Sequence, residues 1–285
     1  MLNPQRLHRF NPAASNHQAV FCSSMIQVRV LPFGVLKDRL GHHEFPLELP
    51  EGSTVSDLLD QLGDALEIVH ESGSPSATAN LSSSFLQGIA VSVNAEYASA
   101  SQVLYDGDEI GLLPPVSGGS ASSADPIQTA NSGSVTLTRE PIDTPSLIAA
   151  TKHAEDGAVV VFDGIVRNHT RNRQTLHLDY EAYEEMALNQ MQTLAAQARE
   201  EHAVRHVTMV HRLGRIHVGE TSVLIIVASA HRAQAYAASR WLIDTLKKTV
   251  PIWKRETFVD GAVWAAGEPF PEHLSIAPAE AKNDA

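Results

Sequence analysis

The sequence predicts an α+β protein with two domains. A stretch of small, polar residues without periodicity, at 117–134, has the composition of a flexible linker. It divides the 285-residue chain into about 95 residues before it and about 150 after it, and both are ordinary domain sizes. Within each part, strand and helix patterns are mixed without strict βαβ alternation, which favours an α+β fold over a parallel α/β fold.

The part before the linker predicts a small sheet with one helix. The helix is expected to begin near Thr54, because Asp57 follows three residues later and apolar residues then recur at helical spacing. Gly63 is expected to end it. The first two strands are expected to pair as a half-buried hairpin, and the order is β-β-α-β-β. Alternating apolar and polar residues predict these strands at Ile26–Val30, Phe45–Leu49, Ile89–Asn94 and Glu109–Leu113.

The part after the linker predicts two long helices among several strands. The helices are Glu184–Glu201 and Ala233 to about Lys248, and Pro251 stops the second one. Ser229 is expected to cap the second helix. Apolar or alternating runs predict strands at Ala158–Phe162, Leu176–Tyr183, Val207–Val210, Val223–Val227 and Trp253–Phe258.

Composition argues against several classes of protein. The formal net charge of −12 disfavours general nucleic-acid binding, which requires a basic surface. No stretch approaches the roughly 20 apolar residues of a membrane span. Cys22 is the single cysteine, so no disulfide framework or cysteine-based metal site is expected, and a reducing cytoplasm fits best. Residues 1–24 lack the apolar core of a secretory signal and are expected to be a disordered leader, with Met25 as an alternative start.

The strand predicted at Glu109–Leu113 runs directly into Pro114-Pro115-Val116-Ser117-Gly118-Gly119. Two residues without side chains can pass through a narrow channel, so Gly118 and Gly119 suit a tail that carries a terminal acyl group into a buried site. Together with the β-β-α-β-β order, this ending resembles the small, sulfur-carrier subunit of molybdopterin synthase (MoaD-like). The resemblance implies a ubiquitin-like β-grasp domain over residues 25–119.

The same resemblance implies a chemistry for Gly119. In that family the terminal glycine is activated as an adenylate and converted to a thiocarboxylate, which supplies sulfur to the substrate. The carboxylate must therefore be free, but Gly119 is followed here by Ser120. The resemblance implies either proteolytic release after Gly119 or a fusion that cannot carry sulfur as it stands.

Three basic clusters stand out after the linker. The first lies in a charged segment that should form a mobile loop, and the other two lie at the two ends of the second predicted helix. Each cluster alone is ordinary, since lysines suit a helix C-terminus and charged loops are usually solvated. Together, in an acidic protein, they predict an anion pocket. The clusters are Arg167 with Arg171 and Arg173, His231 with Arg232, and Lys247 with Lys248 and Lys254.

These clusters fall in the strings Gly-x-Val-Arg-Asn-His, Ser-Ala-His-Arg and Leu-Lys-x-x-x-Pro-x-Trp-Lys-Arg-Glu. The strings closely resemble the large, catalytic subunit of molybdopterin synthase (MoaE-like), and the likeness covers nearly all of residues 135–268. It implies an α/β-hammerhead catalytic domain at 135–270, preceded by a linker at 120–134 and followed by a tail at 271–285. The chain thus resembles a fusion of both subunits.

The likeness to the large subunit also implies roles for single residues. Lys247 and Lys254 match catalytic lysines, and Arg167, His231 and Arg232 match residues that bind the phosphate of the substrate, cyclic pyranopterin monophosphate. The reaction would insert sulfur from the Gly119 thiocarboxylate to form the dithiolene of molybdopterin, without a cofactor or a metal. The implied partners are an adenylating, sulfur-loading enzyme and a second copy of the chain.

Two other functions stay open. The chain could be a catalytic subunit that relies on a separate small subunit, or a non-enzymatic, ubiquitin-like sulfur carrier with a docking domain. The clustered Lys247 and Lys254 favour an enzyme, because a docking domain has no need of them. Structural roles are expected for the remaining candidates. The scattered histidines lack a metal-ligand spacing and are expected to be surface or packed residues: His202, His206, His211 and His217. Trp241 and Trp253 are expected in the core or in a pocket wall. Glu181, Glu184 and Glu185 lie near a helix start and are expected to complement the helix dipole.

Overall fold

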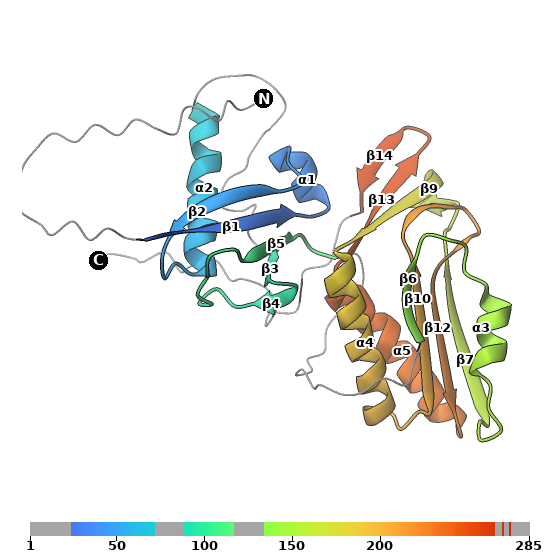
Figure 1. The fold of residues 1–285 in the computed structure, drawn as a ribbon. Coiled ribbons are helices and arrows are strands. Elements are labelled where there is room, and N and C mark those ends of the chain that lie inside the picture. Colours follow the sequence, from blue (N-terminus) through green and yellow to red (C-terminus); the bar gives the residue numbers. More distant parts are fainter. Residues whose placement is uncertain (1–23, 72–87, 117–133, 266–269, 271–273, 275–285) are drawn as a thin grey trace, which may run out of the picture.

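The computed structural model describes residues 24–71, 88–116, 134–265, 270 and 274 (Figure 1). The predicted leader up to residue 23, which includes Cys22, lies outside these ranges. So do the Gly118-Gly119 terminus, nearly all of the predicted linker and most of the predicted C-terminal tail. Within the described ranges, no helix is long and apolar enough to cross a membrane.

The N-terminal domain is a five-stranded sheet with a long helix packed against it (Figure 1). The sheet order is β2-β1-β5-β3-β4, in which β1 and β5 are parallel and the other pairs are antiparallel. First and last strands that lie parallel beside a crossing helix form a β-grasp fold, so this prediction is confirmed. The elements are β1 (Met25–Pro32), α1 (Val35–Leu40), β2 (Phe45–Pro50), α2 (Val55–Glu71), β3 (Ala90–Val93), β4 (Glu96–Ala98) and β5 (Glu109–Leu113).

The alternation in β1 builds the core of this domain. Ile26, Val28 and Val30 are buried, whereas the residues between them are exposed. The buried side chains pack in one cluster with Leu58 and Leu62 of α2. Burial of such a side chain contributes about 1.5–3 kcal/mol, so the alternation determines which face of the strand meets the helix.

Helix α2 begins where the sequence predicts and ends later. Asp57 Oδ2 accepts hydrogen bonds from the backbone N–H of Thr54 at 2.7 Å and from its hydroxyl at 2.8 Å. These bonds lower the pKa of Asp57. The predicted end at Gly63 is wrong, because the helix continues to Glu71. A glycine inside a helix costs only about 1 kcal/mol, and good helix formers follow it.

The sequence patterns do not predict α1 or β4. Helix α1 joins β1 to β2, so the predicted hairpin is an antiparallel pair connected by a helix instead of a tight turn. With six residues, α1 is too short to display helical periodicity. Its end is marked by Gly41, which adopts a left-handed conformation and donates its N–H to the Lys37 carbonyl.

The C-terminal domain combines a four-stranded sheet with a second sheet at one end. The order of the first is β6-β10-β12-β7, with α4 and α5 on one face and α3 on the other (Figure 1). The second has the order β11-β9-β13-β14, and β8 pairs with β9. The elements are β6 (Ser134–Thr138), α3 (Thr144–Thr151), β7 (Ala158–Ile165), β8 (His169–Thr170), β9 (Arg173–Ala182), α4 (Glu184–Glu201), β10 (His206–Arg212), β11 (Gly214–His217), β12 (Thr221–Ser229), α5 (Arg232–Thr249), β13 (Ile252–Phe258) and β14 (Gly261–Trp264).

The long elements of this domain lie where the sequence predicts them. Helix α4 covers the predicted residues, and α5 ends two residues before Pro251. The charged segment Arg167–Arg173 is not an irregular loop, because β8 and β9 pair there as a hairpin. Its turn residues, Arg171 and Asn172, both have positive φ. The pairing therefore gives this segment a defined backbone.

The predicted cap of α5 is wrong. Ser229 is the last residue of β12 and pairs with Ala158, so it is still in extended backbone. The N-cap residue is His231, without a capping side chain, and its N–H donates to Ser229 Oγ at 3.4 Å. Ser229 therefore belongs to β12, although the sequence pattern assigns it to the start of the helix.

An aromatic cluster joins the two domains. Phe33 stacks on Tyr183 and on Trp253, with ring centroids 4.8 Å and 5.3 Å apart. Trp253 Nε1 also donates to the carbonyl of Pro114, just after β5, at 2.9 Å. Stacked pairs contribute about 0.5–1.5 kcal/mol beyond their buried area. The end of β5 is therefore held against β13. Other buried members of the cluster are Ala90, Ala95, Leu113, Val116, Met186 and Phe270.

Candidate active site

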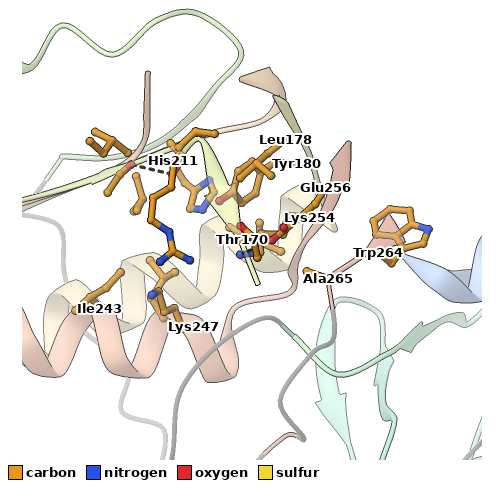
Figure 2. A pocket seen from close by; sticks show the side chains of 18 of the residues that line it. Thr170, Leu178, Tyr180, His211, Ile243, Lys247, Lys254, Glu256, Trp264 and Ala265 are labelled. Carbon is orange, nitrogen blue, oxygen red and sulfur yellow. Dashed lines mark hydrogen bonds and ion pairs between the residues drawn. The ribbon is translucent and has the colours of Figure 1, made fainter. Parts of the chain in front are cut away.

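A cavity of about 690 Å³ lies between the end of α5 and the sheet that contains β9 and β13 (Figure 2). Its remaining walls come from the ends of β7, β10 and β12, from β14, and from residues between 166 and 171. The volume lies within the usual range of about 300–1,000 Å³ for small-molecule sites. The cavity sits where the two sheets of the C-terminal domain meet.

The two lysines that were predicted to be catalytic line this one cavity. Lys247 lies in the last turn of α5, and Lys254 lies in β13. Pro251 ends the helix between them, so the chain turns and both side chains reach the same space. Lys254 Nζ is 3.4 Å from Glu256 Oε1, whereas Lys247 forms no ion pair or hydrogen bond with any residue that the structure describes.

Three arginines extend the positive charge. Arg167, Arg171 and Arg173 all line the cavity, near or within the β8–β9 hairpin. Arg173 donates to Asp260 Oδ1 at 2.7 Å and lies 3.9 Å from the centre of the Phe258 ring. That hydrogen bond lowers the pKa of Asp260. Arg167 has no such partner among the described residues, so its guanidinium is free to bind an anion through two parallel hydrogen bonds.

Buried polar groups form the inner end of the cavity. Glu256 is buried, and its Oε2 has no hydrogen-bond partner among the described residues. The His211 ring meets the Tyr180 ring edge-on, with centroids 5.1 Å apart. Burial lowers the pKa of His211 to about 4 and raises that of Tyr180. A neutral imidazole then donates from Nδ1 to the Arg212 carbonyl at 3.0 Å.

The cavity carries a surplus of positive charge. Five cationic side chains and one carboxylate line it, although the chain as a whole is strongly acidic. Such a surplus favours a ligand with phosphate or carboxylate groups. In the part of the chain that the structure describes, no group of His, Cys, Asp or Glu side chains is arranged to hold a metal ion.

His231 and Arg232 lie away from this cavity. Both are exposed at the start of α5, and neither lines the cavity. Arg232 and Lys247 stand near opposite ends of the 18-residue helix α5, which separates them by about 22 Å along the axis. Within one chain, the five predicted site residues therefore form two groups, with Arg167, Lys247 and Lys254 together.

The C-terminal domain matches the family model of the MoaE protein over residues 137–249. The molybdopterin synthase catalytic subunit of Bacillus subtilis is 38% identical over 128 residues, which are 45% of this chain and 82% of that protein. The catalytic subunit of a Nostoc species is 42% identical over 130 residues, which are 45% of this chain and 79% of that protein. The chain belongs to the molybdopterin synthase catalytic subunit family.

The N-terminal domain matches the ThiS family model over residues 30–119. This member of the molybdopterin synthase family therefore carries a MoaD-like domain in the same chain, and the predicted fusion is confirmed. A crystal structure of molybdopterin synthase from Staphylococcus aureus is 38% identical, covering 46% of this chain and 95% of that chain with a TM-score of 0.44.

Sequence reasoning missed several residues that line the molybdopterin synthase cavity. His211 was expected to be an ordinary packed or surface histidine, and Tyr180 and Trp264 were not singled out, yet all three line the cavity. Glu256 stands in the string that contains Lys254 and could have been found there. The other three come from strands whose order in space is not visible in a sequence.

Proposed function

We propose that the chain is a molybdopterin synthase in which an N-terminal sulfur-carrier domain is joined to its catalytic domain. It transfers sulfur from a thiocarboxylate at Gly119 to cyclic pyranopterin monophosphate and forms the dithiolene of molybdopterin. One observation carries the proposal. Just after β5, on the way to Gly119, the Pro114 carbonyl accepts a hydrogen bond from Trp253, which directly precedes Lys254 in β13.

The short distance along the chain supports this arrangement. Gly119 lies five positions after Pro114, and an extended stretch of five residues spans at most about 17 Å. The acyl group of Gly119 must therefore act close to the place where Pro114 is held. The cavity with Lys247 and Lys254 borders the carrier domain, because Trp264 lines the cavity and contacts Asp38 of that domain.

The charge of the cavity suits the proposed substrate. Cyclic pyranopterin monophosphate carries a phosphate, and the thiocarboxylate of the donor is a second anion. Arg167 and Lys247 have no internal ion pair among the described residues, so both can receive these anions. Lys254 is oriented by the buried Glu256 at 3.4 Å. The lysines would hold the two anions together and supply or accept protons.

The transfer balances without a cofactor. At two neighbouring carbons of the pterin precursor, a thiocarboxylate sulfur forms a C–S bond in place of a C–O bond. At one carbon the cyclic phosphate ester opens and the oxygen stays on the phosphate, and at the other the oxygen leaves as water. Water then hydrolyses each acyl C–S bond and regenerates the Gly119 carboxylate of the carrier, so two loaded donors are consumed for each dithiolene. Reloading requires an enzyme that adenylates Gly119 and supplies sulfur, and such an enzyme is a proposed partner.

A second copy of the chain is the other proposed partner. His231 and Arg232 match phosphate-binding residues by resemblance, yet they lie about 22 Å from Lys247 along α5. In a homodimer, these exposed side chains could complete the cavity of the neighbouring chain. The proposed assembly is therefore a dimer of fused chains.

The bond between Gly119 and Ser120 distinguishes two versions of this function. In the first, proteolysis after Gly119 frees the carboxylate, and the carrier domain stays on the surface that it occupies here. In the second, the bond persists and a separate small subunit supplies the sulfur. Because Ser120 follows Gly119 in the chain, the first version requires cleavage of this bond and the second does not.

Intact mass spectrometry of the protein purified from its native host tests the proposal. A fragment that ends at Gly119 and gains roughly 16 Da, the difference between sulfur and oxygen, is expected. The same preparation should convert cyclic pyranopterin monophosphate to molybdopterin without an added small subunit. An intact chain that turns over only when a separate small subunit is added would favour the second version. No turnover in either case would contradict the proposed function.

A further inference from the structure

Trp264 forms the part of the cavity wall that lies nearest the carrier domain. It ends β14, where it pairs with Arg255 of β13, and it lines the cavity together with Ala265. The N–H of Ala265 donates to the Lys254 carbonyl at 2.9 Å. The position of this short strand therefore affects the backbone of an active-site lysine.

The side chain of Trp264 is held by the other domain. Its indole Nε1 donates a hydrogen bond of 2.7 Å to Asp38 Oδ2, and Asp38 belongs to α1 of the carrier domain. Figure 2 shows Trp264 beside the pale blue ribbon of that domain, on the opposite side of the cavity from Lys247. One wall of the catalytic cavity is thus anchored by a residue of the carrier.

Helix α1 is itself fixed on the catalytic domain. Lys37 Nζ, next to Asp38, pairs with Glu181 Oε2 at 3.0 Å. Phe33, just before the helix, stacks between Tyr183 and Trp253. These contacts set the place of Asp38 relative to β13 and β14, so its carboxylate is available to Trp264 only while the carrier domain is docked.

We propose that the docked carrier domain completes the substrate cavity, with Asp38 acting as a positioning residue for Trp264. This inference rests on the proposed function, because the ligand is the pterin substrate. When the carrier domain dissociates from the catalytic domain to be reloaded, Trp264 loses its hydrogen bond to Asp38. The affinity of the cavity for the substrate then falls. By linkage, substrate binding strengthens carrier docking by the same factor.

Four single variants of the full chain, and one double variant, test this coupling. Asp38→Ala removes the acceptor, Asp38→Asn keeps an oxygen acceptor, and Trp264→Phe keeps a ring but removes the donor. Asp60→Ala is the matched control, because Asp60 is an exposed carboxylate of α2 that makes no contact with the catalytic domain among the described residues. Titration with cyclic pyranopterin monophosphate gives Kd, and steady-state turnover gives KM and kcat.

Asp38→Ala is expected to raise Kd and KM about three- to tenfold, with kcat changed less than about twofold. Asp38→Asn should recover most of the loss, and Asp60→Ala should match wild type. Asp38→Ala combined with Trp264→Phe should bind no more weakly than Trp264→Phe alone, because both remove the same bond. The indole N–H resonance of Trp264, assigned by its absence in Trp264→Phe, should shift in Asp38→Ala.

The outcomes separate this inference from the proposed function. If wild type neither binds nor converts the pterin, the proposed function fails and the coupling falls with it. If wild type binds the pterin and Asp38→Ala binds it equally well, only the coupling is overturned. Equal losses in Asp38→Ala and Asp60→Ala would also overturn it, since a general effect of charge would explain both.

Discussion

The two faces of β13 meet different surroundings. Trp253 is 4% exposed and packs among apolar side chains of both domains. Lys254 and Glu256, on the opposite face, line the charged cavity. Because side chains alternate along a strand, one strand presents a docking face and a chemical face. A substitution at Trp253 should therefore affect mainly stability, whereas one at Lys254 should affect mainly catalysis, although the two residues are adjacent.

The largest effect is expected from the docking face. Trp253→Ala should lower the free energy of unfolding by about 3–5 kcal/mol, because it opens a cavity in the cluster that joins the domains. Trp253→Phe keeps a ring but loses the hydrogen bond to Pro114, and should cost about 1 kcal/mol. Urea unfolding measures both. Equal losses in the two variants would show that the ring itself does not hold the domains together.

A lysine that lines the cavity from α5 should instead affect turnover and leave stability nearly unchanged. Lys247→Ala is expected to lower kcat/KM at least about 100-fold, or about 2.7 kcal/mol of transition-state stabilisation. Its free energy of unfolding should change by less than about 0.5 kcal/mol, since the side chain is exposed. Lys152→Ala, at an exposed lysine after α3, is the control. A Lys247→Ala protein that keeps wild-type turnover would remove this residue from the mechanism.

The fold could largely be predicted, because its long elements carry strong periodic patterns. The alternation of Ile26, Val28 and Val30 and the helical spacing in α4 identify buried faces directly. The missed elements are short, and α1 has only six residues. The sequence places the end of α2 too early because Gly63, whose cost inside a helix is only about 1 kcal/mol, is not by itself a stop signal.

The site could be predicted in part. Arg167, Lys247 and Lys254 were grouped by charge and by resemblance, and the structure brings them to one cavity. His231 and Arg232 could not be separated from them in the sequence, because a linear string does not reveal which end of α5 faces the cavity. Contacts between domains, such as that of Trp264 with Asp38, join residues more than two hundred positions apart and leave no local pattern.

His211, at the buried end of the cavity, is expected to have a smaller effect on stability, and this effect depends on pH. Burial lowers the pKa of His211 from 6.5 to about 4, so the unfolded chain binds a proton there between these values and the folded chain does not. The stability that His211 contributes is full above pH 6.5 and is lost as pH falls toward 4, by about 2 kcal/mol between pH 7.5 and pH 5. Between pH 7.5 and pH 5, the free energy of unfolding measured in urea should fall by about 2 kcal/mol less in His211→Gln than in wild type. An identical pH dependence in both proteins would contradict a neutral, buried His211.

The smallest effect is expected from a substitution at Gly34, which lies against Trp253 where the two domains meet. Gly34 has φ of +50°, and an added Cβ would lie 3.2 Å from both Pro114 and Trp253. Gly34→Ala should therefore cost about 1–2 kcal/mol in the free energy of unfolding, from backbone strain together with a loosened contact between the domains. Gly41→Ala is the matched control, because Gly41 also has positive φ but meets nothing within 4 Å. Both variants place a side chain at positive φ, but only Gly34→Ala disturbs the contact between the domains. A larger KM for the pterin in Gly34→Ala alone would show that carrier docking affects the cavity. Equal KM values would show that the docking contact and the cavity are independent.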